Sequence, residues 1–350
     1  MSAAPRPSPA FLLASALAAL GGAWLCIEAE AAELITRGAA KHREELLAAG
    51  RALRAEAPRF VAAVGPLLFA LLVLTHPGAR TRVAGLGARR AAGLAAGLTA
   101  WTFLLLGLAP ARYPAFDPWS FAILVLAAIA VTLTGGELRR TGPGLTGPAL
   151  LLWLAMWVPF DLRSYRALWL GPPGLDYAVF ALWITTLAAL AFGALPEDER
   201  LGLRLPGLRD LGHGLGWLLA FGALAIPLGL GLGFLKPNVG LDAASTVLAF
   251  LGILLTVALP EELFFRGVLD ARLQASLPGR PWASLLASSS LFGLMHWNNA
   301  GSLRERLAYV FLATIAGGFY GLAYRRSGGL WAAVLAHTLV DVLWKLLLHR

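Results

Sequence analysis

Long runs of apolar residues, separated by short polar stretches, dominate this chain of 350 residues. An apolar run of about 17 to 25 residues is long enough to cross the hydrocarbon core of a membrane as a helix. Arg, Pro and Gly cluster between the runs, and Trp and Tyr lie near several of their ends, as expected at a membrane interface. We therefore expect an all-α fold, a polytopic transmembrane helical bundle with about 9–12 membrane helices. The predicted runs lie at 9–27, 60–76, 91–109, 118–135, 146–160, 175–195, 211–235, 241–259, 282–297, 306–324 and 328–348.

Residues 28–59 differ from the other segments, because six acidic and six basic side chains interleave there with Ala and Leu. Such a mixture is typical of an exposed or interfacial helix. The first run could instead be a signal peptide, since Arg6 precedes it and residues 29–31 resemble a cleavage site, but its length favours a retained helix. We predict an N-terminal transmembrane helical region at 1–205 and a C-terminal region at 206–350 that holds all the candidate chemistry.

The composition supports a membrane protein, since 58% of the residues are hydrophobic and only 14% are charged. Soluble domains have about 25% charged residues. The net charge of +9 is spread over short loops without a basic–aromatic stripe, so we expect membrane lipid as a partner and no nucleic acid. Outside 28–59, more Lys and Arg lie on the side of the N-terminus, which favours a cytoplasmic N-terminus. Cys26 is the only cysteine, which excludes an internal disulfide and a multi-cysteine metal site.

Two adjacent glutamates, Glu261 and Glu262, follow Pro260 inside one of the most hydrophobic stretches of the chain. Ionisable groups at membrane depth are costly unless they are paired or hydrated, so they indicate function by default. Arg266 lies four positions after Glu262, on the same helical face, where the two can pair. Glu261 is rotated by about 100° from Glu262, so it can point at a different centre. Alternatively, the glutamates could lie at a helix end in headgroup water.

Two later apolar runs bring further ionisable residues. His296 ends the run 282–297, while His337 and Asp341 lie four positions apart inside the run 328–348. The spacing puts His337 and Asp341 on one helical face, where Asp341 could orient the ring. Together with Glu261, the two histidines could also supply a two-histidine, one-carboxylate metal site. Spacing alone does not separate a metal site from a metal-free one.

Other protease chemistries fit the sequence less well. Ser288, Ser289 and Ser290 lie one to two turns before His296, but without the glycine context of a serine nucleophile. Asp176 and Asp242 follow only fragments of an aspartyl motif. A transporter with a proton relay, or an inactive membrane scaffold or immunity protein, could also carry buried Glu, His and Asp. Transporters often show paired broken helices in two matching halves, and no matching halves are visible here.

Three motifs in order resemble the CPBP family of intramembrane endopeptidases, which includes the type 2 CAAX prenyl endopeptidases and the Abi or bacteriocin-processing-like proteins. The resemblance covers roughly 205–350 and implies a helical bundle with a water-accessible cavity inside the membrane. The motifs here read Glu261-Glu262-x-x-x-Arg266, Phe292-x-x-x-His296 and His337-x-x-x-Asp341.

The resemblance also implies roles for these residues. Glu261 and His296 match the pair thought to activate a water molecule, and His337 with Asp341 match the pair thought to stabilise the oxyanion. Glu262 and Arg266 match supporting positions. The family often has Asn where this chain has Asp341, and an ionised Asp can only accept hydrogen bonds. Asp341 is therefore either protonated or acts through His337.

We therefore predict an intramembrane endopeptidase that hydrolyses a peptide bond in a membrane-associated protein or peptide. No cofactor is required by the motifs, although a divalent metal such as Zn held by Glu261, His296 and His337 stays open. We expect an integral, multi-pass protein of the bacterial inner (cell) membrane.

Overall fold

The computed structural model describes residues 6–40, 44–107, 117–138, 142–170, 175–192, 201–235 and 243–345. This part of the chain is almost entirely helical and contains no strand, which confirms the predicted all-α class. The helices are α1 (Pro9–Ala40), α2 (Glu44–Ala55), α3 (Ala57–Leu74), α4 (Pro77–Gly85), α5 (Gly87–Gly107), α6 (Pro118–Leu138), α7 (Gly147–Asp161), α8 (Asp176–Phe192), α9 (Leu208–Gly231), α10 (Ala243–Ile253), α11 (Leu259–Glu262), α12 (Ala271–Ser276), α13 (Pro281–Met295), α14 (Leu303–Ser327) and α15 (Leu330–Leu343).

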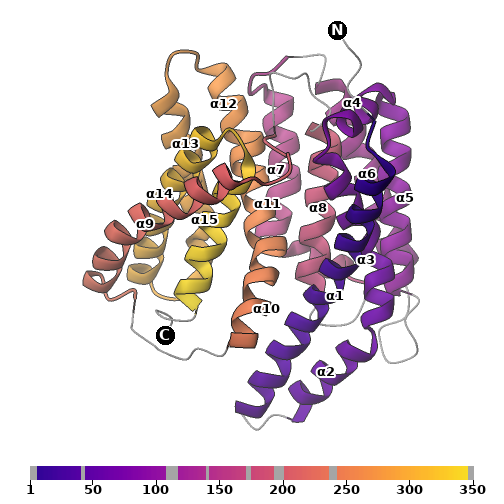
Figure 1. The fold of residues 1–350 in the computed structure, drawn as a ribbon, viewed down its shortest axis with the longest axis horizontal. Helices are drawn as coiled ribbons and strands as arrows, with labels where there is room; N and C mark the ends of the chain where they lie inside the picture. Colours follow the sequence, from indigo (N-terminus) through magenta and orange to yellow (C-terminus); the bar gives the residue numbers. More distant parts are fainter. Residues whose placement is uncertain are drawn as a thin grey trace.

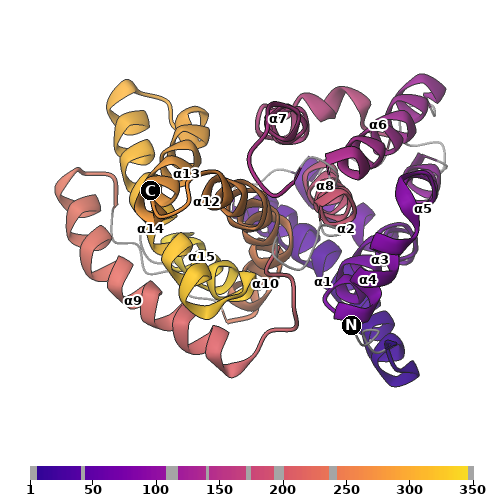
Figure 2. The ribbon, with the colours of Figure 1, turned by 90° about the horizontal axis from the view of Figure 1, so that it is seen from above.

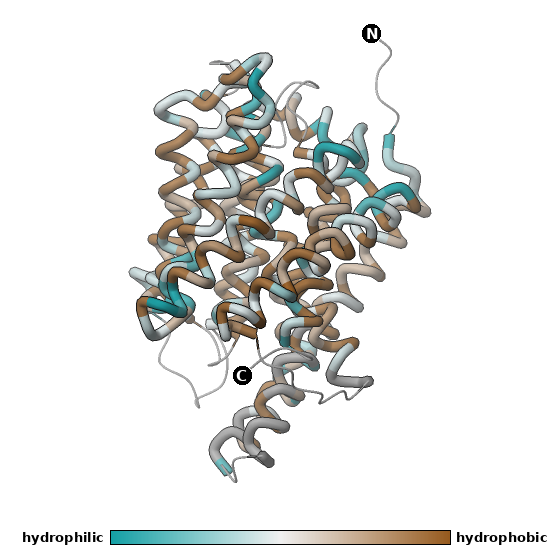
Figure 3. The backbone as a smooth tube through the Cα atoms, turned by 90° about the vertical axis from the view of Figure 1, so that its left-hand side faces the viewer, coloured by the Kyte–Doolittle hydropathy of each residue, from teal (hydrophilic) through white to brown (hydrophobic). Residues whose placement is uncertain are grey.

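The bundle has the character of a multi-pass membrane protein. Among the described residues, six helices are long and apolar enough to cross a membrane, and four shorter apolar helices accompany them. Figure 3 shows a mostly hydrophobic chain through the middle of the bundle, with hydrophilic segments gathered toward its ends. Every predicted apolar run coincides with part of a helix. The hydrophobic pattern therefore located the membrane helices.

The helix that carries the glutamates extends beyond the apolar run 241–259. It continues through α10, α11 and α12 to Ser276, past Pro260, a residue type that often kinks or ends a helix. Two π-helical turns, Leu254–Ala258 and Leu263–Asp270, flank the proline and the glutamates. Such turns accommodate the hydrogen bond that a proline cannot make, and they are frequent at functional sites. The glutamates therefore lie in the middle of a long apolar helix and not at a helix end.

The described residues of the charged segment, 28–40 and 44–59, are almost entirely helical, as predicted. Helix α1 runs through it to Ala40, and α2 packs back against α1, with an ion pair of 2.9 Å between Arg54 and Glu28. In Figure 1 the α1–α2 pair extends beyond the other helices at the lower end of the bundle. This ion pair is one instance of the mixed charge that the sequence indicated.

The helices form two groups. In Figures 1 and 2, α1 to α8 lie on one side and α9 with α12 to α15 on the other, while α10 stands between them. The groups meet through an aromatic core, in which the indole nitrogen of Trp153 on α7 donates to the carbonyl oxygen of Phe264 at 2.9 Å. The same indole ring packs edge-on against Phe265, with 5.4 Å between ring centroids. The N-terminal group thus supports the helix that carries the two glutamates.

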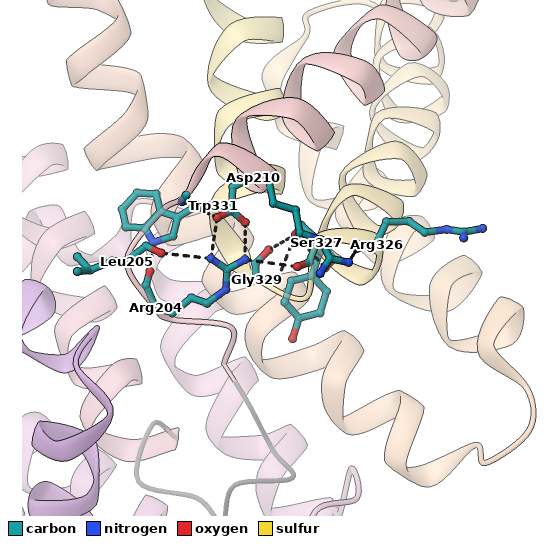
Figure 4. Close-up of polar contacts among 10 residues, drawn as sticks. Arg204, Leu205, Asp210, Arg326, Ser327, Gly329 and Trp331 are labelled. Atoms are coloured by element: carbon teal, nitrogen blue, oxygen red, sulfur yellow. Dashed lines mark hydrogen bonds and ion pairs between the residues drawn. The ribbon is translucent and has the colours of Figure 1, made fainter. Parts of the chain in front are cut away.

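A polar clamp holds the start of α9 to the turn between α14 and α15 (Figure 4). Arg204 forms two 2.7 Å hydrogen bonds with the carboxylate of Asp210, a bidentate arrangement that adds strength and directionality. Arg204 also donates to the carbonyl oxygen of Ser327. A Cβ at Gly329 would lie within 2.8 Å of the Arg204 guanidinium, so a larger residue there would push the guanidinium out of its present position. The clamp therefore fixes one end of α9 beside α15.

A second ionic cluster ties α12, α13 and α14 together at the same end of the bundle. The buried carboxylate of Asp270 accepts from Arg325 at 2.6 Å and 3.1 Å, and from Gln274 at 3.0 Å. Arg325 also donates to the hydroxyl of Ser284 at 2.8 Å. These contacts satisfy a charge that would be expensive to bury alone.

Candidate active site

The first motif places a buried ion pair at the centre of the C-terminal group. Glu262 and Arg266 both have fully buried side chains, and their Oε2 and Nε atoms lie 3.1 Å apart. Arg266 also donates to the carbonyl oxygen of Gly317 at 3.0 Å and lies 4.6 Å from the centre of the Phe292 ring. The i,i+4 pairing predicted from the sequence is therefore present.

His337 on α15 is the hub of the site. Its Nδ1 atom lies 2.8 Å from Oε1 of Glu262, and its Nε2 atom lies 3.5 Å from Asp341 and 3.8 Å from Glu261. A carboxylate can only accept, so Nδ1 carries the proton in the bond to Glu262. The sequence assigned the orientation of this ring to Asp341. In the structure, the short contact of the ring is with Oε1 of Glu262. The other carboxylate oxygen of Glu262 pairs with Arg266, which fixes the position of the carboxylate.

His296 is held differently. It caps the C-terminal end of α13, and its Nδ1 atom lies 2.8 Å from the carbonyl oxygen of Phe292. Since a carbonyl only accepts, Nδ1 donates and Nε2 is left without a proton in the neutral ring. The 3-10 turn His296–Asn299 that follows has exposed side chains from Trp297 onward. His296 therefore lies where the buried helix meets the surface.

The two histidines and Asp341 line one cavity of about 130 Å³. Its other walls are mainly apolar and come from α9, α14 and α15, and from Phe234 and Leu235 just after α9. Glu261 does not line this cavity. Its Oε2 atom lies 3.8 Å from Nε2 of His337 and is buried without a hydrogen-bond partner, while 14% of the side chain is exposed. The structure thus brings together the predicted residues of all three motifs around the His337 ring and the adjoining cavity.

The metal ligands considered from the sequence are Glu261, His296 and His337. Among the described residues, no group of three or more His, Cys, Asp or Glu side chains is placed to hold a metal ion. Hydrogen bonds to Glu262 and to the Phe292 carbonyl occupy Nδ1 of His337 and of His296, which leaves Nε2 of each ring as the nitrogen that could bind a metal. No step below is routed through a metal.

The residues of the alternative protease chemistries lie in other contacts. The hydroxyl of Ser288 donates to Asp270 at 3.3 Å, within the ionic cluster that ties α12 to α14. Asp176 pairs with Arg166 at 2.8 Å at the start of α8. Asp242 lies outside the described residues. Neither a serine–histidine contact nor an aspartate pair is formed by these candidates in the described part of the chain.

The sequence missed the aromatic surroundings of the histidines. Tyr309 and Tyr320 on α14 both line the cavity and stack on the rings of His296 and His337, respectively. Phe292 packs against both imidazole rings, with centroid distances of 4.8 Å and 5.8 Å. Aromatic residues are common in apolar helices, so only the packing of α14 against α13 and α15 distinguishes these tyrosines from others.

Residues 243–343 match the family model described as type II CAAX prenyl endopeptidase Rce1-like. This segment, less than a third of the chain, is similar to the Rce1-like proteins. The resemblance to the CAAX-type intramembrane endopeptidases is therefore confirmed, and the match spans the residues of all three motifs, from Glu261 to Asp341. No curated protein and no solved structure matches the chain. Helix α9, which walls the cavity, lies outside the Rce1-like segment.

Proposed function

We propose that this protein is an intramembrane endopeptidase that cleaves a peptide bond near the membrane-anchored end of a protein or peptide. The observation that carries the proposal is the His337 ring, held by Glu262 at 2.8 Å while its Nε2 atom lies near Glu261 and Asp341 at the cavity. The Rce1-like segment supports a protease of the CAAX type. The apolar cavity walls suit a hydrophobic substrate segment.

Glu261 is proposed as the general base. Its buried Oε2 atom has no hydrogen-bond partner among the described residues, and at 3.8 Å from Nε2 of His337 it is close enough for one water molecule beside the two atoms to bond to both. Glu261 takes a proton from that water as its oxygen attacks the scissile carbonyl carbon. His296, whose Nε2 is free to accept, helps to orient the water. General-base catalysis of this kind contributes about 10² to 10⁴-fold.

His337 is proposed to stabilise the oxyanion. When the ring carries both protons, Nδ1–H donates to Glu262 and Nε2–H can donate to the negative oxygen of the tetrahedral intermediate. The neighbouring carboxylate of Asp341, 3.5 Å from Nε2, stabilises that charged ring. An ionised Asp341 can only accept hydrogen bonds, so it acts on the oxyanion through His337 and not directly. Collapse of the intermediate breaks the carbon–nitrogen bond, and the leaving amine receives the proton held by Glu261.

The test uses the purified full chain in liposomes with two quenched fluorogenic peptides. One ends in a farnesylated Cys-Ala-Ala-X sequence, and the other replaces the prenyl group with a hydrophobic peptide anchor. Glu261→Gln should lower kcat by about 100-fold or more, while the chain remains folded. The matched control is Glu56→Gln, because Glu56 pairs with Arg59 outside the site.

Full activity of Glu261→Gln would remove the base assignment. Absence of cleavage of both peptides by the wild-type chain, together with dissipation of an imposed proton gradient, would favour a transporter. A parallel reaction with a chelator separates a metal-dependent from a metal-free mechanism. Loss of activity that returns with Zn²⁺ would contradict the metal-free mechanism.

A further inference from the structure

Helix α14 carries none of the three sequence motifs, yet its side chains contact both candidate histidines. The ring of Tyr309 stacks on His296 with 5.2 Å between centroids and 26° between planes. The ring of Tyr320 stacks on His337 with 4.7 Å between centroids and 12° between planes. The two tyrosines are eleven residues apart, about three helical turns, so they lie on one face of α14. That face also lines the cavity.

Each tyrosine is itself held by other aromatic rings. Phe234 and Trp344 meet Tyr309 edge-on, at 5.3 Å and 5.4 Å between centroids. Edge-to-face and offset arrangements are the preferred geometries of aromatic pairs. The plane of the Tyr309 ring is therefore fixed by two other rings of the cavity wall.

Tyr320 is held in the same manner deeper in the bundle. Phe292 packs against it at 83°, with 6.0 Å between centroids, and Phe221 from α9 contacts it at 6.3 Å. Tyr320 is only 2% exposed, so its ring has little room to turn. The imidazole of His337 lies nearly parallel to a ring that cannot easily move.

The polar contacts alone leave each imidazole underdetermined. His296 and His337 each have one short hydrogen bond, through Nδ1, and the contacts of His337 Nε2 with Asp341 and Glu261 are longer, at 3.5 Å and 3.8 Å. Such contacts at the ring nitrogens leave the ring plane free to tilt. A stacked neighbour removes that freedom and fixes the direction of Nε2. Small displacements of catalytic groups have large effects on rate, since a misplacement of about 1 Å can cost about 100-fold.

We propose that Tyr309 and Tyr320 are positioning residues that fix the ring planes of His296 and His337, so that both Nε2 atoms address the cavity. This inference rests on the proposed function for its effect on rate. The stacking itself does not depend on that function. The phenol rings carry the effect, and the hydroxyl groups are not needed for it.

The experiment compares two substitutions at each position. Tyr320→Phe keeps the stacked ring and should retain kcat within about threefold, whereas Tyr320→Leu removes the stack and should lower kcat by about 10- to 100-fold with a smaller change in KM. The same contrast is expected at Tyr309. The control is Phe311→Leu on α14, because Phe311 is 51% exposed on the outside of the helix.

A second measurement observes the histidine rings directly and does not depend on activity. The full chain is labelled with 15N-histidine in micelles, and the nitrogen signals of His337 are assigned as those that disappear in His337→Gln. Tyr320→Leu should shift these signals, and Tyr320→Phe should leave them near the wild-type positions. If Tyr320→Leu does not fold, the partly exposed Tyr309 and the signals of His296 decide the question.

Unchanged kcat and unchanged histidine signals in the folded leucine variants would overturn the proposal. Equal losses in the Phe and Leu variants would overturn it too, because they would assign the effect to the hydroxyl. Failure of the proposed function looks different: the wild-type chain would cleave neither peptide, while the histidine signals would still respond to loss of the stack.

Discussion

Replacing Arg266 with methionine should destabilise the protein by about 3–5 kcal/mol, because it leaves a buried carboxylate without its partner. The two charged groups lie 3.1 Å apart and are fully buried. At that distance their attraction is about 5 kcal/mol in an effective dielectric constant of about 20. Methionine retains part of the packing against Phe292, but it loses the 3.0 Å hydrogen bond to the Gly317 carbonyl.

The assay is reversible unfolding of the purified chain in mixed micelles by SDS titration, with helicity as the signal. The two single losses of stability should not add in the double variant Glu262→Gln/Arg266→Met. Its loss should be smaller than their sum by at least about 1 kcal/mol, since neither charged group is then buried without its partner. Arg280→Met serves as the control, because Arg280 lies in an exposed turn. A loss below about 1 kcal/mol for Arg266→Met, or strictly additive losses in the double variant, would refute the reasoning.

Two further predictions concern packing and orientation. Gly293→Ala should lower the free energy of unfolding by about 1–3 kcal/mol, because its Cβ would lie 2.0 Å from a hydroxyl of α14. The control Gly318→Ala should be nearly neutral in the same unfolding assay, because its Cβ would meet nothing within 4 Å. Outside the α1–α2 pair, arginines concentrate at the α12–α13 end of the bundle, which favours a cytoplasmic location for that end and an opposite one for the cavity end. In a Cys26→Ser background, an impermeant maleimide should therefore label Arg280→Cys only in inverted vesicles and Asn298→Cys only in right-side-out vesicles; the reverse pattern would contradict this orientation.

Features set by local spacing were predictable from the sequence. Apolar runs of sufficient length define the helices, because helix formation satisfies the backbone wherever water is absent. The pairing of Glu262 with Arg266 follows from the pitch of one helix, as does the shared face of His337 and Asp341. The structure contains each of these relations.

Relations between helices were not predictable from spacing. The contact of Glu262 with Nδ1 of His337 joins residues 75 positions apart, and it depends on how α11 and α15 are aligned along their axes. The sequence suggested Asp341 for this role because the two residues share one helix. Spacing likewise did not decide whether Pro260 kinks the helix, since a wider helical turn can absorb the missing hydrogen bond.

The position of α14 shows why packing, and not motif, decides the geometry of the site. A Cβ at Gly317 would lie 3.2 Å from the ring of Phe292 and from the backbone of Ser289, which is tighter than ordinary contact, so the glycine helps α14 to approach α13 closely. Small residues allow the same close approach between helices in membranes generally. That approach brings the tyrosine face of α14 within stacking distance of the histidines. A larger residue at Gly317 would therefore displace the rings that hold the imidazoles, although it touches neither histidine, and the catalytic geometry depends on a residue that belongs to none of the three motifs.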